Sequence, residues 1–469
     1  MNVDSIVNTA MTEFKTKLKQ LCSALPEGEL TPQIAEAVFV HMRTALNEGG
    51  ARALEAWLAS MDESLDLVRV DNEVYRFKAL TVKSAFSIFG PLRIERRLYQ
   101  NASDERSYAP LDHAWGMADH YLTPELREMA LYANAHLTDG ETAGLLEKCL
   151  GRAPHATQIK KCVEQLGALC EASGEALLQE VRQETQAPSE TAALVASLDG
   201  VNVPLREKGA KTGRPRERPG GDGEQKASAW RNAMVGSVSC YGVTEKDGES
   251  GPEQLLAVYT ARMPEKGFPT FRQAFEAEVT QLESCLPGGA VKVLLLDGAR
   301  NLWRYAENSP SFEGYLKLVD YWHALEHLSR AGEALFGKDC DEARRWYYKW
   351  KNKLKEEHGA VLKLVRSMRR YAREKNLRAS RLKSLEREMG YFRRNASKMD
   401  YAGFRAKNLP IGSGPVEAAC KSIVRTRMCR SGMRWSTQGG QTILTLRAII
   451  KSGRWDSFWR EIRALQNAA

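Results

Sequence analysis

The sequence predicts a multi-domain α/β protein: a mixed sheet interrupted by an all-helical segment and preceded by a mainly helical N-terminal region with a small sheet. Three observations support this fold class. The chain has 469 residues, which is long for a single hydrophobic core. The spacing of its apolar residues changes several times along the chain, from the three-to-four spacing typical of helices to the short apolar runs typical of strands. Its basic residues are concentrated in the last third.

The first 188 residues divide into three regions that differ in the spacing of their apolar residues. Residues 1–66 have apolar positions three and four apart and are expected to form helices. Residues 67–120 are rich in β-branched and aromatic residues around a Gly90-Pro91 turn, which predicts a small β module. Residues 121–188 return to the helical period, with Thr123 as an N-cap. Short helices separated by tight turns fit either a helix-turn-helix that reads DNA or a plain bundle.

Residues 189–323 alternate strands and helices. The apolar run AALVASLDG predicts a buried strand that ends at Asp199-Gly200, and AVKVLLLDGARNLWRYA predicts a strand entering a helix. Three antiparallel-type strands followed by alternating helices and parallel-type strands outline a mixed sheet. Within this region, the turn-rich stretch 207–226 is expected to be a loop or hairpin tip.

The remainder of the chain is predicted to be helical and basic. Residues 324–409 contain 23 Lys and Arg against 11 Asp and Glu, and residues 410–469 place a Gly-rich loop before a helix and further C-terminal helices. From Ala324 to Ala469 the count is 33 basic against 14 acidic residues, whereas the rest of the chain has 35 against 45. Such an asymmetry favours a polyanion-binding surface, because each neutralised phosphate releases counterions. We therefore expect this third of the chain to bind nucleic acid.

Cysteine usage and hydropathy exclude several classes of protein. The nine cysteines are scattered singly without any C-x-x-C pair, which argues against a disulfide framework and against a cysteine-based zinc site. No stretch of about 18 uncharged apolar residues occurs, so no membrane partner is expected. The protein is expected to be cytoplasmic.

Two predicted strands end in the same tripeptide, Leu-Asp-Gly, with Asp199 in one and Asp297 in the other. Active sites of α/β sheets lie at the carboxyl ends of their strands, although Asp-Gly after a strand is also a common turn. Glu417 adds a third carboxylate, because it opens a helix after Gly412 and Gly414. Three carboxylates can hold two Mg²⁺ ions about 3.5–4 Å apart for phosphodiester chemistry, and Mn²⁺ can substitute.

Together these motifs resemble the RNase H-like core of DDE transposases. The likeness is to bacterial insertion-sequence transposases of the ISKra type, akin to the Mutator-like group. It covers about residues 80–460 and rests on SLDGV at Asp199, LLLDGAR at Asp297, VDYWHALEHL around His323, PIGSGPVEAACK at Glu417 and the C-terminal RTRMCRSGMRWS. The resemblance implies an RNase H-like sheet and a metal-binding catalytic triad of Asp199, Asp297 and Glu417.

The resemblance also implies roles for residues around this triad. Asp320 and His323 form an Asp-x-x-His element, in which the histidine contacts the scissile phosphate or its leaving oxygen and the aspartate supports it. A histidine that merely hydrogen-bonds an aspartate is the structural alternative. The insertion at 324–409 would contact DNA. Candidate phosphate contacts are basic residues of the insertion and of the helix expected to follow Glu417, where a solvated face is the alternative: Arg369, Arg370, Arg393, Arg394, Lys421, Arg425, Arg427 and Arg430.

The implied function is a DNA transposase that hydrolyses phosphodiester bonds at the ends of its element. The freed 3′-OH would then be joined to target DNA, so the expected partner is double-stranded DNA, both at the element ends and in the target. Because the reaction acts on paired ends, a homodimer or higher oligomer on DNA is expected. The source would be bacterial, with the protein associated with the nucleoid when bound to DNA.

Three alternatives stay open from the sequence. An RNase H-like nuclease without joining activity would use the same carboxylates, and an inactive DNA-binding derivative would keep only the fold. The third alternative is a zinc hydrolase, because His323-x-x-Glu326-His327 matches the inverted zinc-protease motif with both histidines on one helical face.

Overall fold

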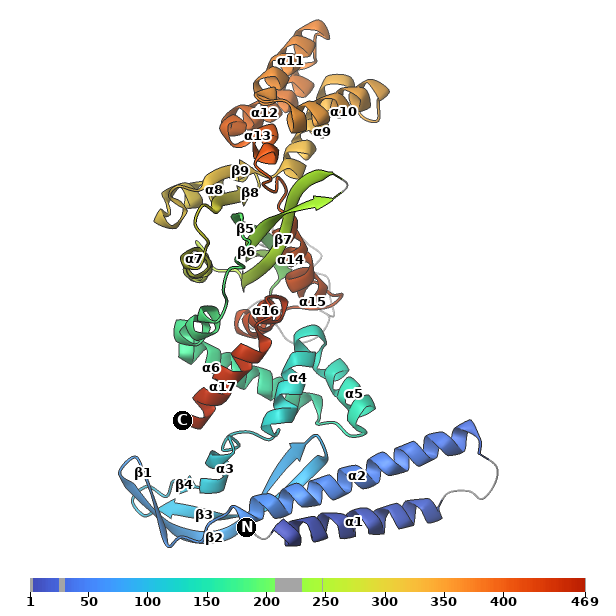
Figure 1. The fold of residues 1–469 in the computed structure, drawn as a ribbon, viewed down its shortest axis with the longest axis vertical. Coiled ribbons are helices and arrows are strands. Elements are labelled where there is room, and N and C mark those ends of the chain that lie inside the picture. The colour runs from blue at the N-terminus through green and yellow to red at the C-terminus, as the bar shows by residue number, and fades with distance from the viewer. Residues whose placement is uncertain (1–2, 25–29, 207–229, 247, 469) are drawn as a thin grey trace, which may run out of the picture. The chain divides into compact units, whose positions relative to one another are not determined.

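The computed structural model describes residues 3–24, 30–206, 230–246 and 248–468, so the loop expected at 207–226 lies outside the described residues. The chain is a multi-domain α/β protein, as predicted, with two compact units (Figure 1). One unit comprises Met1–Leu177 and Asp456–Ala469, and the other comprises Leu178–Trp455. Within the described part, no helix is both long and apolar enough to cross a membrane.

The first unit combines a helical hairpin, a four-stranded antiparallel sheet in the order β1-β2-β3-β4, and a set of helices. Its hairpin and sheet are α1 (Val3–Ser23), α2 (Pro32–Ser60), β1 (Leu67–Val70), β2 (Glu73–Ser87), β3 (Gly90–Asn101) and β4 (Ser107–Tyr108). Its further helices are α3 (Pro110–Ala114), α4 (Pro124–His136), α5 (Asp139–Leu150), most of α6 (Ala156–Gln183) and α17 (Trp455–Ala468).

Capping residues and a glycine determine where several of these helices begin or are interrupted. Thr123 is the N-cap of α4 and Pro124 lies in its first turn, as predicted. A capping box between Thr138 and Glu141 begins α5. Gly174 interrupts α6 with a φ of 53°, a conformation that glycine adopts without the steric cost that other residues meet.

The second unit is built on a five-stranded mixed sheet in the order β7-β6-β5-β8-β9. β5, β6 and β7 are antiparallel neighbours, whereas β8 is parallel to β5 and β9 is parallel to β8. The strands are β5 (Ala193–Pro204), β6 (Trp230–Lys246), β7 (Glu249–Arg262), β8 (Val291–Leu296) and β9 (Leu316–Val319). α7 (Pro269–Ser284) follows β7 and α8 (Arg300–Asn308) follows β8, before the short 3-10 turn Pro310–Phe312.

The prediction that the first strand ends at Asp199-Gly200 is wrong, because β5 continues to Pro204. Its pairing with β8 runs only from Ala193 to Ala196, but its antiparallel ladder with β6 continues to the Pro204–Trp230 pair. Gly200 is therefore an extended strand residue, not part of a turn. Its missing side chain makes room for Asn232 of the neighbouring strand.

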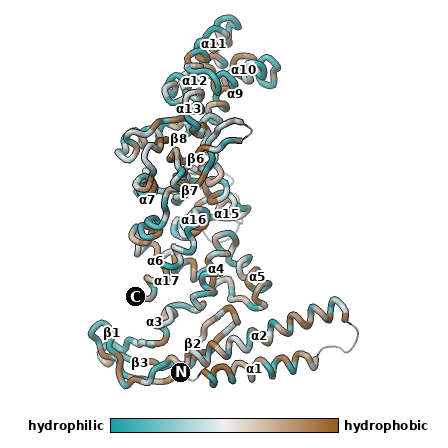
Figure 2. The backbone as a smooth tube through the Cα atoms, viewed as in Figure 1, coloured by the Kyte–Doolittle hydropathy of each residue, from teal (hydrophilic) through white to brown (hydrophobic). Residues whose placement is uncertain are grey.

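In the sequence, a block of helices lies between β9 and the last helices of this unit. It consists of α9 (Tyr321–Phe336), α10 (Asp341–Glu356), α11 (Ala360–Glu374), α12 (Ala379–Asn395), the 3-10 turn Ala396–Lys398 and α13 (Tyr401–Ala406). Hydrophilic residues are prominent along α10 to α12 (Figure 2). The block's buried residues, such as Trp346, Leu364 and Phe392, nevertheless belong to the same apolar cluster as the strands β5, β8 and β9. The helical block and the sheet thus share one core.

The remaining helices of this unit are α14 (Gly414–Ala419), a π-helical segment (Cys420–Arg425), α15 (Thr426–Met428) and α16 (Thr437–Lys451). A buried ion-pair network fastens the end of α16 to the core. Glu278 of α7 accepts hydrogen bonds from Arg454 Nη1 at 2.8 Å and from Arg182 Nε at 3.0 Å. All three side chains are buried, and removing one partner of a buried ion pair is strongly destabilising.

Candidate active site

Three aspartates lie side by side at one edge of the five-stranded sheet. The parallel register pairs Ala196 with Leu294, and three residues further the same offset sets Asp199 beside Asp297. The next pair of strands matches Leu296 with Val319, which sets Asp297 beside Asp320. The Asp320 N–H donates to the Leu296 carbonyl at 2.8 Å, so the ladder continues to this point. Residues at one level of a parallel sheet face the same side, and the three carboxylates therefore converge.

The carboxylate of Asp320 connects this edge to a distant part of the chain. It is fully buried and is the N-cap of α9, where Oδ1 accepts the backbone N–H of His323 at 2.8 Å. Its second oxygen, Oδ2, accepts the backbone N–H of Ser413. Alongside, the Tyr321 N–H donates to the Ile411 carbonyl at 2.9 Å. The loop before α14 is thereby fixed against the end of β9.

This loop delivers Glu417 to the site. The Glu417 N–H donates to the Ser413 carbonyl at 3.1 Å, and Ser413 Oγ donates to Glu417 Oε1 at 3.1 Å. Helical pairing then changes to the π type from Cys420 to Arg425, an irregularity often found at functional sites. Trp435, beyond this helix, donates its N–H to the Pro204 carbonyl at the end of β5. The segment carrying Glu417 is therefore held to the sheet on both sides.

Few partners neutralise the two strand aspartates. Asp199 accepts the Gly200 N–H at 2.6 Å and the Cys420 thiol at 3.7 Å, and Asp297 accepts the Ala299 N–H at 2.9 Å. Among the described residues neither carboxylate pairs with a lysine or an arginine. Burial raises the pKa of Asp297, and the nearby Asp199 and Asp320 carboxylates raise it further. This concentration of negative charge would be relieved by a bound cation.

His323 places a positive group beside these carboxylates. Its Nδ1 lies 3.4 Å from Asp320 Oδ1 and 4.0 Å from Glu417 Oε1. The Asp320 carboxylate raises the pKa of His323 to about 9 against the opposing effect of burial, so the ring is charged at neutral pH. Burial would raise the pKa of Asp320, but its bonds to His323 and Ser413 outweigh burial and hold the pKa below the ordinary value. The two groups form an ion pair inside the site.

The donor set suits a hard divalent cation. Ligand atoms of Asp320, His323 and Glu417 lie within 4.8 Å of one another, with Asp199 and Asp297 on the neighbouring strands. Carboxylate oxygens are the ligands that Mg²⁺ prefers, and unpaired carboxylates fit this ion. Within the described part of the chain, this metal-ligand group contains neither Glu326 nor His327 of the zinc-protease motif, and it does not include Asp199 or Asp297 either.

His327 is engaged elsewhere. Its Nδ1 lies 2.5 Å from Glu388 Oε2, and its ring stacks on Tyr391 with 3.4 Å between centroids. Tyr391 itself was not anticipated from the sequence. It lies on α12, is 5% exposed and packs directly against Gly298, the residue after Asp297. No feature of the sequence links residue 391 to residue 298, because the contact depends on how the helical block packs on the sheet.

The Tyr391 hydroxyl is buried without a hydrogen-bond partner. Burial raises the pKa of Tyr391, and Asp297 and Asp320 raise it further, so the hydroxyl keeps its proton. A buried hydroxyl without a partner costs about 1–3 kcal/mol. The helical block thus contributes a protonated donor next to the carboxylate edge.

The candidate DNA-contacting residues occupy two different settings. Most are exposed: Arg369 and Arg370 on α11, Arg393 and Arg394 on α12, Lys421 and Arg425 after Glu417, and Arg430. Arg427 is only 4% exposed, and its guanidinium lies 4.9 Å from the Trp435 ring centroid, so it is not placed for phosphate contact. The expectation of one helix from Glu417 to Arg430 is also wrong at its end, because the helix stops at Met428.

Comparisons with known proteins establish no family. No family model matches the chain, and no curated protein matches it. Among solved structures, the chain is similar to one described as the Drosophila P element transposase strand transfer complex, at 11% identity and a TM-score of 0.25. The similarity covers 73% of this chain and 81% of that one. At this TM-score the likeness does not establish a common fold.

The packing of Tyr391 on Gly298 gives a stability prediction. In Gly298→Ala the new Cβ would lie 2.7 Å from the Tyr391 hydroxyl and closer still to its ring, so the ring must move. We expect a loss of about 1–3 kcal/mol in the free energy of unfolding. Thermal unfolding followed by circular dichroism measures the effect.

Gly140→Ala is the matched control, because nothing lies within 4 Å of a Cβ added there. This helical variant should be as stable as the wild type or slightly more stable. Equal stability of Gly298→Ala and the wild type would contradict the packing of Tyr391 against the active-site edge.

Proposed function

We propose that this protein is a metal-dependent DNA-cutting and DNA-joining enzyme, a DDE-type transposase with an RNase H-like core. The observation that carries the proposal is a set of carboxylates: Asp199 in β5 lies in register with Asp297 directly after β8. Glu417, 218 positions after Asp199, lies with Asp320 and His323. An antiparallel β7-β6-β5 set with β8 and β9 added in parallel supports the RNase H-like assignment.

Asp199, Asp297 and Glu417 would hold the metal in this proposal, with Asp320 fixing the loop that carries Glu417. Bound Mg²⁺ ions would supply activation of the attacking oxygen and neutralisation of the leaving one. The charged His323 ring would donate a proton in a hydrogen bond to a phosphate oxygen while its other nitrogen faces Asp320. Tyr391 would offer a second donor, which is neutral, at the same edge.

The exposed arginines of α11 and α12 would form the DNA-binding surface. The apolar residues of α11 and α12 belong to the same core as the sheet, so DNA held by the helical block is held by the body that carries the carboxylates. A nuclease without joining activity remains the second candidate, because the hydrolytic step needs the same carboxylates. The engagement of His327 by Glu388 and Tyr391 favours either of these over a zinc hydrolase.

Loss of one strand aspartate tests the catalytic proposal. With labelled duplex carrying the ends of the element that encodes the chain, the wild type should cut in Mg²⁺ and not in EDTA. Asp297→Asn keeps the shape of the side chain but removes a charged metal ligand, so cutting should fall by about three orders of magnitude or more. Gel electrophoresis of the labelled strands measures cutting, and joined products separate a transposase from a nuclease.

Asp341→Asn is the control, since this exposed acid lies in the first turn of α10 and should cut as the wild type does. Cutting by Asp297→Asn at the wild-type rate would contradict the assignment of the carboxylates. If the wild type binds DNA but does not cut with any metal, the protein is a DNA-binding protein without this activity.

The basic surface predicts a salt dependence that can be measured separately. Replacing both Arg393 and Arg394 by alanine should make the DNA-binding constant less dependent on salt. The negative slope of log K against log salt should become less steep by about 0.9 for each phosphate that the variant no longer neutralises. Fluorescence anisotropy with a labelled duplex of fixed length gives this slope. The Lys15→Ala, Lys19→Ala pair removes the same charge from exposed positions of α1 and should leave the slope unchanged. Equal effects of the two pairs would show that only net charge matters.

A further inference from the structure

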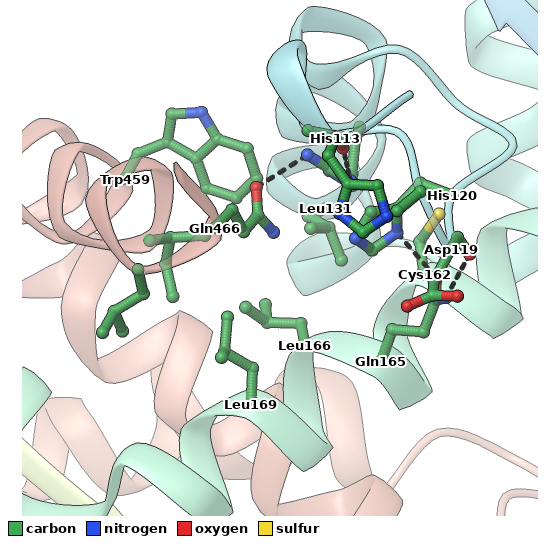
Figure 3. A pocket seen from close by; sticks show the side chains of 15 residues that line it. His113, Asp119, His120, Leu131, Cys162, Gln165, Leu166, Leu169, Trp459 and Gln466 are labelled. Carbon is green, nitrogen blue, oxygen red and sulfur yellow. Dashed lines mark hydrogen bonds between the residues drawn. The ribbon is translucent and has the colours of Figure 1, made fainter. Parts of the chain in front are cut away.

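The first unit contains a cavity of about 260 Å³ that the proposed function does not use (Figure 3). α4, α6 and α17 enclose it together with α3 and the segment that follows α3. The volume is close to the lower end of the range for small-molecule sites. Its walls combine one buried cation with several apolar side chains.

Arg127 of α4 is the cation. It is 2% exposed, and its side chain lines the cavity. Its Nη2 donates to Gln466 Oε1 at 2.7 Å, and Nη1 makes a long contact of 3.4 Å to the Gly116 carbonyl. Its Nε is buried and has no partner. No Asp or Glu among the described residues forms an ion pair with this guanidinium.

The other polar residues around the cavity do not compensate the charge. Burial, and then the charge of Arg127, lower the pKa of His120 to about 4, so that ring is neutral at physiological pH. Asp119 is exposed and does not pair with Arg127. Burial lowers the pKa of Arg127 to about 10, which still leaves it protonated. Arg127 therefore remains charged without an acidic partner among the described residues that line the cavity.

An uncompensated buried charge is costly, and proteins normally pair such charges or bind a ligand that does. The planar guanidinium matches the oxygens of a phosphate or carboxylate group. Leu131, Leu166 and Leu169 supply an apolar wall beside it. In Figure 3 these leucines lie around the same space as Gln466 and His120. The lining thus offers one polar anchor and a surface for an apolar body.

We propose that this cavity binds a small organic anion whose oxyanion headgroup pairs with Arg127 and whose apolar body packs among the leucines. The site lies outside the carboxylate cluster and does not depend on the proposed function. A phosphate and a carboxylate headgroup present the same chemistry to the guanidinium, so probes of both kinds are required.

Phenyl phosphate and benzoate are suitable probes, with benzyl alcohol as the neutral counterpart and inorganic phosphate as the headgroup alone. Differential scanning calorimetry of the full chain should show a rise of about 2–5 °C in the unfolding midpoint at a probe concentration near ten times Kd. One or both of the anionic aromatic probes should produce this rise, and benzyl alcohol should not. A larger rise with one of the two identifies the preferred headgroup.

Arg127→Met tests the anchor, because methionine retains much of the length without the charge. Without probe this variant should unfold at the same temperature as the wild type or a higher one, since an unpaired buried charge has been removed. With probe its midpoint should not rise. Leu169→Trp, which fills the cavity and leaves Arg127 in place, should also lose the response and serves alone if Arg127→Met does not fold.

Arg463→Met is the matched control. It removes an exposed arginine of α17 that pairs with Glu128 and does not line the cavity, so the response to the probe should be retained. Absence of any rise in the wild type up to about 10 mM of both anions, a concentration that would detect binding of millimolar Kd, overturns the proposal. A rise that persists in both Arg127→Met and Leu169→Trp also overturns it, because the probe then binds elsewhere.

Discussion

The buried carboxylate of Asp320 is the point on which the arrangement of the second unit depends. One of its oxygens caps α9, where the helical block begins, and the other holds the loop that leads into α14. The chain leaves the sheet after β9 and returns to the same edge about ninety residues later. Hydrogen bonds to a charged acceptor are stronger than those between neutral groups. The Asp320 side chain therefore fixes both the start of α9 and the loop before α14.

This connection has an electrostatic consequence. Bringing Glu417 to an edge that already carries Asp199, Asp297 and Asp320 concentrates negative charge where few protein cations lie. The charged His323 ring balances part of it. The Cys420 thiol and backbone N–H groups stabilise the strand aspartates individually. The remaining negative charge would be relieved by a bound divalent cation.

Parts of this site follow from the sequence by physical reasoning. An aspartate after a short apolar run is predictable as a strand-end carboxylate, and Asp297 is in that position. For Asp199 the predicted strand end is wrong, because β5 continues to Pro204 along its antiparallel pairing with β6. The apolar pattern of one strand does not show how long its neighbour is. For Glu417 the local signal is only its place at the start of a helix after two glycines, and the resemblance to a family added the expectation of a metal-binding role.

Other features depend on tertiary packing and are absent from any local pattern. Tyr391 reaches Gly298 only because the helical block shares its core with the sheet. Arg427, one of several basic residues in its stretch, turns inward over Trp435, whereas Arg425 remains exposed. The spacing of residues in a regular α-helix does not predict which of the two side chains is buried, because the π-helical segment from Cys420 changes the direction in which later side chains point. The unpaired charge of Arg127 is likewise visible only when α4 and α17 are seen together.

The position of a bound metal ion is the most direct test of the proposed carboxylate site. Crystals grown or soaked with Mn²⁺ can be measured at a wavelength where manganese scatters anomalously, which locates the ion without reference to activity. The account predicts an anomalous peak within about 2–2.5 Å of carboxylate oxygens from Asp199 and Asp297, with Glu417 beside it. Manganese peaks found only elsewhere, with the three carboxylates turned apart or paired with protein cations, would contradict it.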